Sequence, residues 1–309
     1  MSTEAPDDAL DAIMSERRQL INLSYRLLGS LAEAEDVAQE TYARWYAMTP
    51  QQRTEIDVPG AWLTTVASRI CLDLLGSARV RRERYVGEWI PEPLPGRGDW
   101  HPTNSTGVAD PADRVSLDES ISMAILVVLD SLTPAERVAF VLHDVFQYSF
   151  AEVAEIVGRT PGACRQLASS ARSRIRSARV PSLPTTKQRQ IVDEFRRAWQ
   201  AQDIAGLIGL LDPNATTIAD GGGIVSAVLH PIVGAELVAE GFADLARRAN
   251  GLRLSERTVN GQPGLVAEQD GKVIVVLAFE IVAGRIRTIW AIRNPEKLRA
   301  WTPPSLDEP

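Results

Sequence analysis

The stretch that decides the fold reads SFAEVAEIVGRTPGACRQLASSARSRIRSAR and covers residues 149–179. Ser149 precedes a short run with helical spacing, and Glu152 completes the capping-box pattern of a helix start. A turn at Gly158 interrupts this run, and Thr160 followed by proline marks the start of a second, longer helix. These features predict a helix-turn-helix, a motif that places its second helix in the major groove of DNA.

The predicted second helix is strongly basic, with six arginines and no acidic residue between residues 159 and 179. Binding to DNA phosphates is the simplest explanation, although like charges also cover many solvated helix faces. Arg and Gln can form paired hydrogen bonds to base edges, and Ser can bond bases or phosphates. The predicted contacts are Arg165, Gln166, Ser169, Ser170, Arg172 and Arg174.

Upstream of this motif, residues 10–85 read as three helices separated by short breaks. In the second, Ser30 is the expected N-cap with Glu33 completing a capping box. The apolar residues of that helix recur at helical spacing and should face a core: Ala34, Val37, Ala38, Tyr42 and Trp45. The third helix ends in a second basic cluster, formed by Arg79, Arg81, Arg82 and Arg84.

Two breaks divide the chain into three domains. Residues 86–112 are rich in Pro, Gly and polar residues, which predicts an extended connector. Helices return over residues 113–180, with a capping box at Thr133 and Glu136. After a second break at 180–187, an amphipathic helix leads into short alternating segments, which predict an α+β domain. Ile286, Thr288, Trp290 and Ile292 should share one face of its last strand.

Composition fits a multidomain globular protein. A length of 309 residues suggests two or three domains, with 45% apolar and 24% charged residues. The two cysteines are far apart, so neither a disulfide framework nor a zinc site is expected. The acidic N-terminus and the lack of a long apolar run argue against export or membrane insertion, so we expect a cytoplasmic protein. A net charge of −7 leaves room for local basic faces.

The segment AEAEDVAQETYARWY (32–46), followed by PGAWLTTVASRICLDLL (59–75), resembles the first conserved domain of extracytoplasmic-function sigma factors. The helix-turn-helix resembles their second domain. This resemblance implies a non-catalytic subunit that binds core RNA polymerase and directs it to promoter DNA. The implied domains are 8–85 for core polymerase and −10 element binding, 86–112 as a linker, and 113–180 for −35 element binding.

The resemblance also implies roles for individual residues. Asp36, Gln39 and Glu40 would dock on core polymerase, although an acidic helix face can also simply solubilise a helix. The helix from Trp62 to Gly76 would read the non-template strand at the −10 element, where unstacked bases are accessible. The implied −10 contacts are Ser68, Arg69, Asp73, Arg79, Arg81 and Arg82.

Three further motifs resemble a sigma-factor group with a fused C-terminal domain: WIPEPL at 89–94, Asp220–Gly223, and Asn294–Leu298. Residues 187–302 would then be a SnoaL-like, NTF2-like cone that contacts the connector and regulates activity. The implied regulatory contacts are Trp89, Pro91, Glu92, Pro93, Asp220, Gly221, Gly222, Gly223, Asn294, Pro295 and Lys297. One departure is Ile224, which follows the glycines where the group has a basic residue.

Two other functions compete with promoter selection. A SnoaL-type enzyme fused to a sigma-like module could use Asp220 and His230 as an acid–base pair. A ligand-sensing helix-turn-helix regulator would bind a small molecule in the cone and bind duplex DNA without polymerase. We expect no catalytic residue, no metal and no cofactor, and we name core polymerase, promoter DNA and a small-molecule ligand of the cone as candidate partners.

Overall fold

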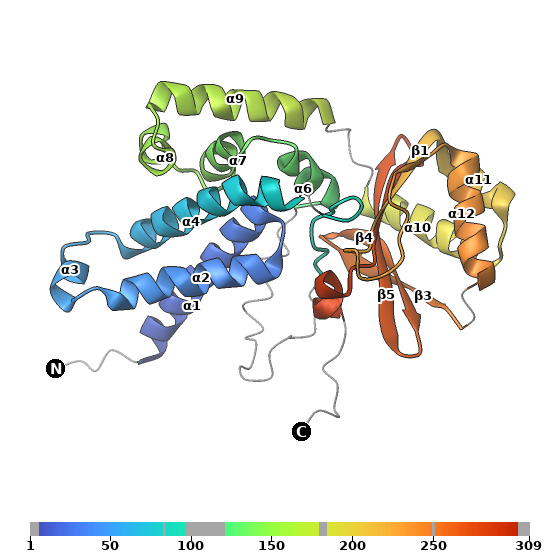
Figure 1. Ribbon diagram of the computed structural model, residues 1–309, viewed down its shortest axis with the longest axis horizontal. Helices are drawn as coiled ribbons and strands as arrows, with labels where there is room; N and C mark the ends of the chain where they lie inside the picture. The colour runs from blue at the N-terminus through green and yellow to red at the C-terminus, as the bar shows by residue number, and fades with distance from the viewer. Residues whose placement is uncertain (1–5, 83–84, 97–120, 179–183, 249–250, 302–309) are drawn as a thin grey trace. The chain divides into compact units, whose positions relative to one another are not determined.

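The computed structural model describes residues 6–82, 85–96, 121–178, 184–248 and 251–301 (Figure 1). The chain divides into two compact units. The first unit comprises Met1–Glu83, Asp110–Leu117 and Leu126–Ala178, and the second comprises Arg84–Ala109, Asp118–Ile125 and Arg179–Pro309. The connector therefore belongs to the same unit as the C-terminal domain, while both predicted DNA-binding modules fall in the other.

The first module consists of the helices α1 (Pro6–Leu28), α2 (Leu31–Ala47), α3 (Pro50–Thr54) and α4 (Pro59–Arg82). α1 packs against α2 and α4. The predicted N-cap is confirmed, because the Ser30 side chain accepts a hydrogen bond from the backbone N–H of Glu33. Ala34, Val37 and Ala38 are buried, as the helical spacing of α2 predicts.

The second helical module consists of α6 (Met123–Asp130), α7 (Pro134–Phe140), the π-helical turn η1 (Val141–Val145), α8 (Phe150–Val157) and α9 (Pro161–Ala178). Both predicted capping boxes are confirmed, at Thr133 with Glu136 and at Ser149 with Glu152. The helix-turn-helix is confirmed as α8 and α9. Its turn contains Gly158 at φ 67°, a left-handed conformation that glycine adopts without steric cost.

The second unit contains α10 (Thr185–Gln200), α11 (Ile204–Leu210), α12 (Ala235–Arg248) and the short 3-10 helix η2 (Pro295–Trp301). Its strands are β1 (Leu211–Asp220), β2 (Ile232–Val233), β3 (Arg253–Val259), β4 (Gln262–Gln269), β5 (Lys272–Val282) and β6 (Arg285–Ile292). They form one sheet in the order β2-β1-β6-β5-β4-β3, in which only β1 and β6 are parallel. This is the predicted α+β domain.

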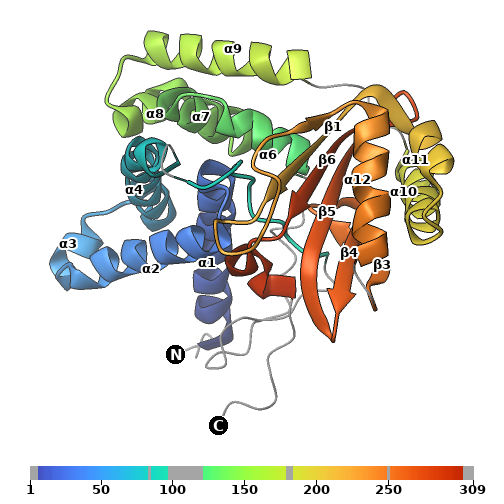
Figure 2. The same ribbon diagram turned by 45° about the vertical axis from the view of Figure 1, so that its right-hand side comes forward.

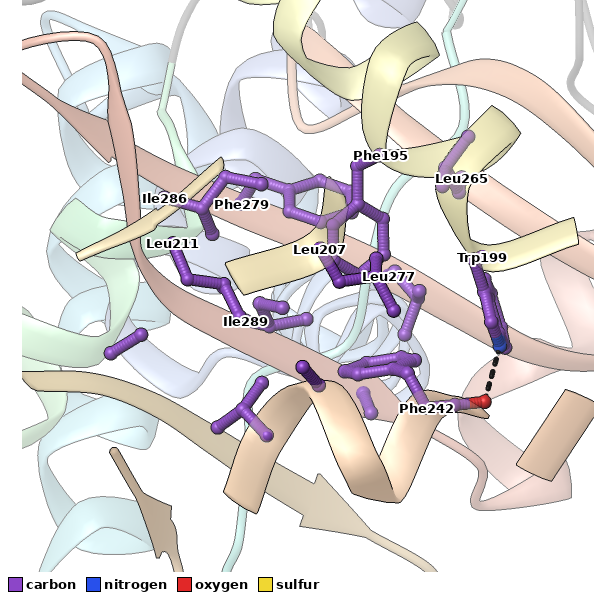
Figure 3. Close-up of a cluster of buried hydrophobic side chains, with 14 of the residues drawn as sticks. Phe195, Trp199, Leu207, Leu211, Phe242, Leu265, Leu277, Phe279, Ile286 and Ile289 are labelled. Carbon is purple, nitrogen blue, oxygen red and sulfur yellow. Dashed lines mark hydrogen bonds between the residues drawn. The ribbon is translucent and has the colours of Figure 1, made fainter. Parts of the chain in front are cut away.

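The three α-helices of this unit cover one face of the curved sheet (Figure 2). Aromatic side chains from α10 and α12 fill the space between helices and sheet (Figure 3): Phe195, Trp199 and Phe242. The Trp199 Nε1–H donates to the Phe242 carbonyl over 2.7 Å, so the polar atom of this buried ring is satisfied. The interior of the expected cone is thus packed with side chains.

The prediction that Ile286 shares one face of β6 with Thr288, Trp290 and Ile292 is wrong for Ile286. Ile286 joins the helix-covered core, together with Ile289, whereas Trp290 pairs with Ala278 on the other face. The cause is a β-bulge, because β6 advances by two residues where β5 advances by one, between Glu280 and Ile281. One extra residue inverts the alternation of side chains along a strand.

Candidate nucleic-acid interface and connector site

Helix α9 presents one buried and one exposed side. Cys164, Ala168, Ala171 and Ile175 are buried and anchor the helix. Its start is capped by the Thr160 hydroxyl, which accepts from the Ala163 N–H over 3.2 Å. Anchoring on one side leaves the opposite side of α9 available to a partner, as a recognition helix requires.

The predicted α9 contacts fall into two groups. Gln166 and Ser169 are exposed opposite the buried residues, and Arg165 is exposed with its guanidinium 5.2 Å from the centre of the Phe150 ring. Ser170, Arg172 and Arg174 instead bond to acidic residues of their own module. Ser170 donates to Glu136 over 2.7 Å, Arg174 lies 3.6 Å from Glu136, and Arg172 lies 2.8 Å from Asp144.

Two exposed residues of α9 stand outside the predicted contacts: Ser173, which was missed, and Arg176, which was counted only as one of the six arginines of the basic segment. Ser173 and Arg176 lie four and three residues further along the stripe that starts with Gln166 and Ser169, and both are exposed. Helical spacing is the signal that could have found them.

Glu136 connects α7 to the recognition helix. Its side chain is 8% exposed, and it accepts hydrogen bonds from the Thr133 N–H over 3.0 Å and from the Ser170 hydroxyl. Burial favours the neutral acid, but the hydrogen bonds from Ser170 and Thr133 outweigh it, so the pKa of Glu136 is lowered. A charged Glu136 therefore fixes the position of α9 relative to α7.

On α2, the three predicted polymerase contacts Asp36, Gln39 and Glu40 are all exposed. Glu40 accepts from the Arg44 Nε over 2.8 Å at an exposed position. Because Val37 and Ala38 are buried on the other side, the acidic residues form an accessible polar face.

On α4, the predicted −10 contacts are only partly accessible. Arg69 and Asp73 are exposed, and the Arg69 Nη2 donates to the Glu155 carbonyl of α8 over 3.0 Å. The predicted −10 contact at Ser68 is corrected, because Ser68 is fully buried beside the buried Ala67 and does not face outward. Arg79, Arg81 and Arg82 lie at the end of α4, outside the residues whose side chains the structure describes.

Asp220, at the end of β1, is the centre of the connector site. It is fully buried, and its carboxylate accepts from the Tyr85 hydroxyl at 2.6 Å, the Ile90 N–H at 3.0 Å and the Lys297 Nζ at 2.7 Å. Burial and the bond to Asp220 raise the pKa of Tyr85 above its ordinary value. One carboxylate thus joins the connector, β1 and η2.

Lys297 and its neighbours hold the connector from the side of η2. The Lys297 ammonium also donates to the Ile90 carbonyl and lies 4.3 Å from the centre of the Trp89 ring, within cation–π range. Asn294 Nδ2 donates to the Tyr85 oxygen over 3.0 Å, and Trp301 Nε1 donates to the Pro93 carbonyl over 2.9 Å. Lys297 and Trp301 therefore hold the connector by its backbone carbonyls, while Asn294 holds the Tyr85 side chain just before it.

The other predicted regulatory residues lie around this cluster. Pro91, Glu92, Pro93 and Gly221 are buried, Trp89 and Gly222 are half-buried, and Gly223 and Pro295 are exposed. The sequence analysis missed Tyr85, Asn260 and Trp301. Asn260 accepts from the Leu94 N–H through its Oδ1 and donates its own N–H to the Leu94 carbonyl, and Gly96 bonds to Thr258, so the connector extends the edge beside β3.

The Asp220 carboxylate is enclosed by its hydrogen-bond partners. Both carboxylate oxygens of Asp220 are hydrogen-bonded and buried, and His230 is exposed.

A separate hollow of about 380 Å³ is lined by Ile208, Leu211, Val233, Leu237 and Arg285, among others. Within the described ranges, no group of three or more His, Cys, Asp or Glu side chains could hold a metal ion. No described helix is long and apolar enough to cross a membrane.

Comparison with known proteins adds family information. Residues 12–81 match the family model for sigma-70 region 2, and residues 122–175 match the model for sigma-70, region 4. The chain is 36% identical to the ECF RNA polymerase sigma factor SigJ of Mycobacterium tuberculosis (strain ATCC 25618 / H37Rv), over 91% of this chain and 90% of that protein. It is 34% identical to the probable ECF RNA polymerase sigma factor SigI of the same strain, over 96% and 97% of the two chains.

A solved structure is similar over nearly the whole chain. The crystal structure of the M. tuberculosis extracytoplasmic function sigma factor SigJ superposes with a TM-score of 0.73 at 32% identity. The superposition covers 96% of this chain and 99% of that one. Both helical modules and the C-terminal α+β domain therefore occur together in a related protein.

Proposed function

The chain belongs to the extracytoplasmic-function family of RNA polymerase sigma factors, and from this premise we propose that its own C-terminal domain restrains it by holding the connector. As a member of this family it directs promoter-specific transcription initiation. The connector site is the part of the structure that we propose controls this activity.

We assign promoter contacts to the two helical modules. Exposed Arg165, Gln166 and Ser169 of α9 suit the −35 element, because they can bond base edges and phosphates. Exposed Arg69 and Asp73 of α4 suit the −10 element, and the acidic face of α2 suits core polymerase. These roles require binding and no bond chemistry, and the enclosed carboxylate of Asp220 favours no catalytic role for the C-terminal domain.

One observation supports regulation by the C-terminal domain, namely the buried ion pair between Asp220 and Lys297 that encloses the connector backbone. A buried pair requires both partners, because either charge alone is strongly unfavourable in the interior. The connector leads from the first DNA-binding module toward the second. Fixing it therefore restricts the arrangements that the two modules can reach, which is how an attached inhibitor would act.

The test is run-off transcription from a promoter library with purified core polymerase, with and without the protein. We expect specific start sites that depend on the wild-type protein. Lys297→Met should raise transcript yield severalfold at limiting protein concentration, because Asp220 loses its partner and the connector is released. Arg189→Met is the matched control, since it breaks an exposed 2.8 Å pair with Glu256 in the same domain.

Each result has a distinct meaning. No start sites with wild-type protein would contradict promoter selection, and tight operator binding without polymerase would then favour a ligand-sensing regulator. Normal start sites with an unchanged or lower yield from folded Lys297→Met protein would contradict restraint by the connector site alone.

A further inference from the structure

Phe150, the first residue of α8, is a half-buried aromatic residue of the helix-turn-helix. The guanidinium of the exposed Arg165 lies over its ring, 5.2 Å from the ring centre. The His143 ring stacks on the same phenylalanine, with 3.8 Å between the ring centres and 26° between the ring planes. Two rings from outside α9 therefore form a stack that reaches one of the exposed arginines of the recognition helix.

The turn between η1 and α8 fixes the orientation of His143. Its Nδ1 lies 2.7 Å from the Tyr148 carbonyl oxygen, and because a carbonyl only accepts, Nδ1 carries the proton and donates it. The turn is π-helical, since the Phe146 N–H bonds to the Val141 carbonyl five residues earlier. It is followed by Gln147 at φ 62°, a left-handed conformation that is uncommon outside glycine. Such a backbone persists where its surroundings determine it, and π-turns are frequent at functional sites.

The same turn contacts α9 at a second position, in a different way. Asp144, which follows His143, lies 2.8 Å from the Nε of Arg172. Arg165 and Arg172 are seven residues apart, or about two helical turns, so they lie on the same side of α9. The carboxylate engages the N–H groups of Arg172, whereas a ring face attracts the charge of Arg165 and leaves its five N–H donors for another partner. Arg165 is therefore held in place with its hydrogen-bonding groups still available.

Holding Arg165 in one orientation matters because base reading requires an ordered side chain. Arginine is among the side chains that lose the most conformational entropy when they are fixed. A guanidinium that already lies over a ring loses less of it on binding DNA, since preorganisation moves that cost to folding. Paired hydrogen bonds to O6 and N7 of guanine, the commonest specific arginine contact, also require the planar guanidinium to meet the base edge in one orientation.

We propose that Phe150 and His143 are positioning residues for promoter recognition, whose stacked rings hold the Arg165 guanidinium in the orientation in which it bonds to a guanine of the −35 element. The proposal rests on the promoter-selecting function proposed above, and it concerns two residues that act through Arg165. Its prediction is that loss of the Phe150 ring weakens the preference for one base and leaves the other base preferences unchanged.

The test is transcription by core polymerase and the full-length protein from promoters randomised over the −35 element, each linked to a barcode in the transcribed region. Arg165→Ala should lower the preference for guanine at one position by about fivefold or more, which identifies that position. Phe150→Leu should lower the same preference by about two- to fivefold, the range of a cation–π contact. Phe150→Tyr keeps the ring and should retain the wild-type preference.

Gln166 provides the matched control on the same helix, because it is exposed and follows Arg165 directly. Gln166→Ala should lower the preference for adenine at a different position, since glutamine pairs with the adenine edge. Phe150→Leu should leave that second preference unchanged, whereas a general loss of order in α9 would lower both. In the Arg165→Ala background, Phe150→Leu should cause no further loss at the guanine position, because the ring acts through the guanidinium.

If circular dichroism shows that Phe150→Leu unfolds, His143→Gln decides, because it removes the stacked ring and keeps a donor for the Tyr148 carbonyl. We expect a loss of about twofold at the guanine position. An unchanged guanine preference in the deciding variant, or equal losses at both positions, would overturn the positioning role. A wild-type preference in Arg165→Ala, or a further loss in the double variant, would overturn it too. An absence of start sites with wild-type protein would instead contradict promoter selection, and this proposal with it.

Discussion

Glu136 makes the helix-turn-helix module sensitive to acid. Its pKa is lowered from an ordinary value of 4.5 because hydrogen bonds from Ser170 and Thr133 outweigh burial. A carboxyl with a lower pKa in the folded state adds stability above its unfolded pKa, and that stability is lost as pH falls through the folded pKa. Glu136→Gln should therefore cost about 1–2 kcal/mol at neutral pH and flatten the loss of stability that sets in as pH falls toward and below the ordinary value of 4.5.

Urea unfolding at several pH values measures this effect. Glu152→Gln is the matched control, because Glu152 also has a lowered pKa and closes a capping box with Ser149, but it is exposed. We expect a smaller loss for the control. Parallel pH profiles for wild type and Glu136→Gln would show that Glu136 is not the titrating group.

At the same scale, contacts between near neighbours could be predicted and distant ones could not. The capping residues Ser30, Thr133 and Ser149 follow from spacing, because a cap and its partner are three positions apart. The Leu27 carbonyl to which Arg137 donates lies 110 positions away, and the Asp220 carboxylate to which Tyr85 donates lies 135 positions away. Nothing in the local pattern around either residue indicates which backbone or carboxylate it will meet.

At the scale of elements, the turn after β1 depends on Gly222. Its φ is 66°, and a Cβ atom there would lie 2.4 Å from the Asn294 Nδ2. Gly222→Ala should cost about 2 kcal/mol or more, the left-handed penalty plus displacement of Asn294 from Tyr85. Gly271→Ala is the control, because its φ is 75° but no atom lies within 4 Å of the added Cβ.

Thermal unfolding of both variants separates backbone strain from the contact. The difference between them should report the displacement of Asn294, and Gly222→Ala should also change transcript yield in the direction of Lys297→Met. Equal losses of stability in the two glycine variants would mean that close approach to Asn294 is unimportant.

The sequence predicted which segments are helices and which are strands. It did not predict on which face of the sheet each β6 side chain lies, or that the connector pairs with the sheet edge. Hydrophobic alternation identified the strand that became β6, yet the bulge moved Ile286 to the opposite face from Trp290. The Pro-rich sequence of residues 89–96 indicates an extended chain. Its pairing with Thr258 and Asn260 depends on a sheet edge formed more than 160 residues later.

At the scale of the molecule, the order of the three modules could be read from the sequence, but their grouping could not. Sequence breaks place the connector between two helical modules. The structure assigns it instead to the C-terminal unit, because Asp220, Lys297 and Trp301 bond to it. Such grouping depends on long-range hydrogen bonds, which leave no periodic signal in the chain.

Because the chain divides into two compact units, a substitution that destabilises one unit should leave the stability of the other unchanged. Lys297→Met leaves the fully buried Asp220 charge without its ion-pair partner, which should destabilise the second unit by about 3 kcal/mol. Hydrogen exchange measured by mass spectrometry should then quicken in β6 and in residues 89–96. It should stay unchanged in α4 and α9, because these helices belong to the other compact unit. Faster exchange in all four segments would mean that the two units unfold together, and the connector would then transmit stability as well as position.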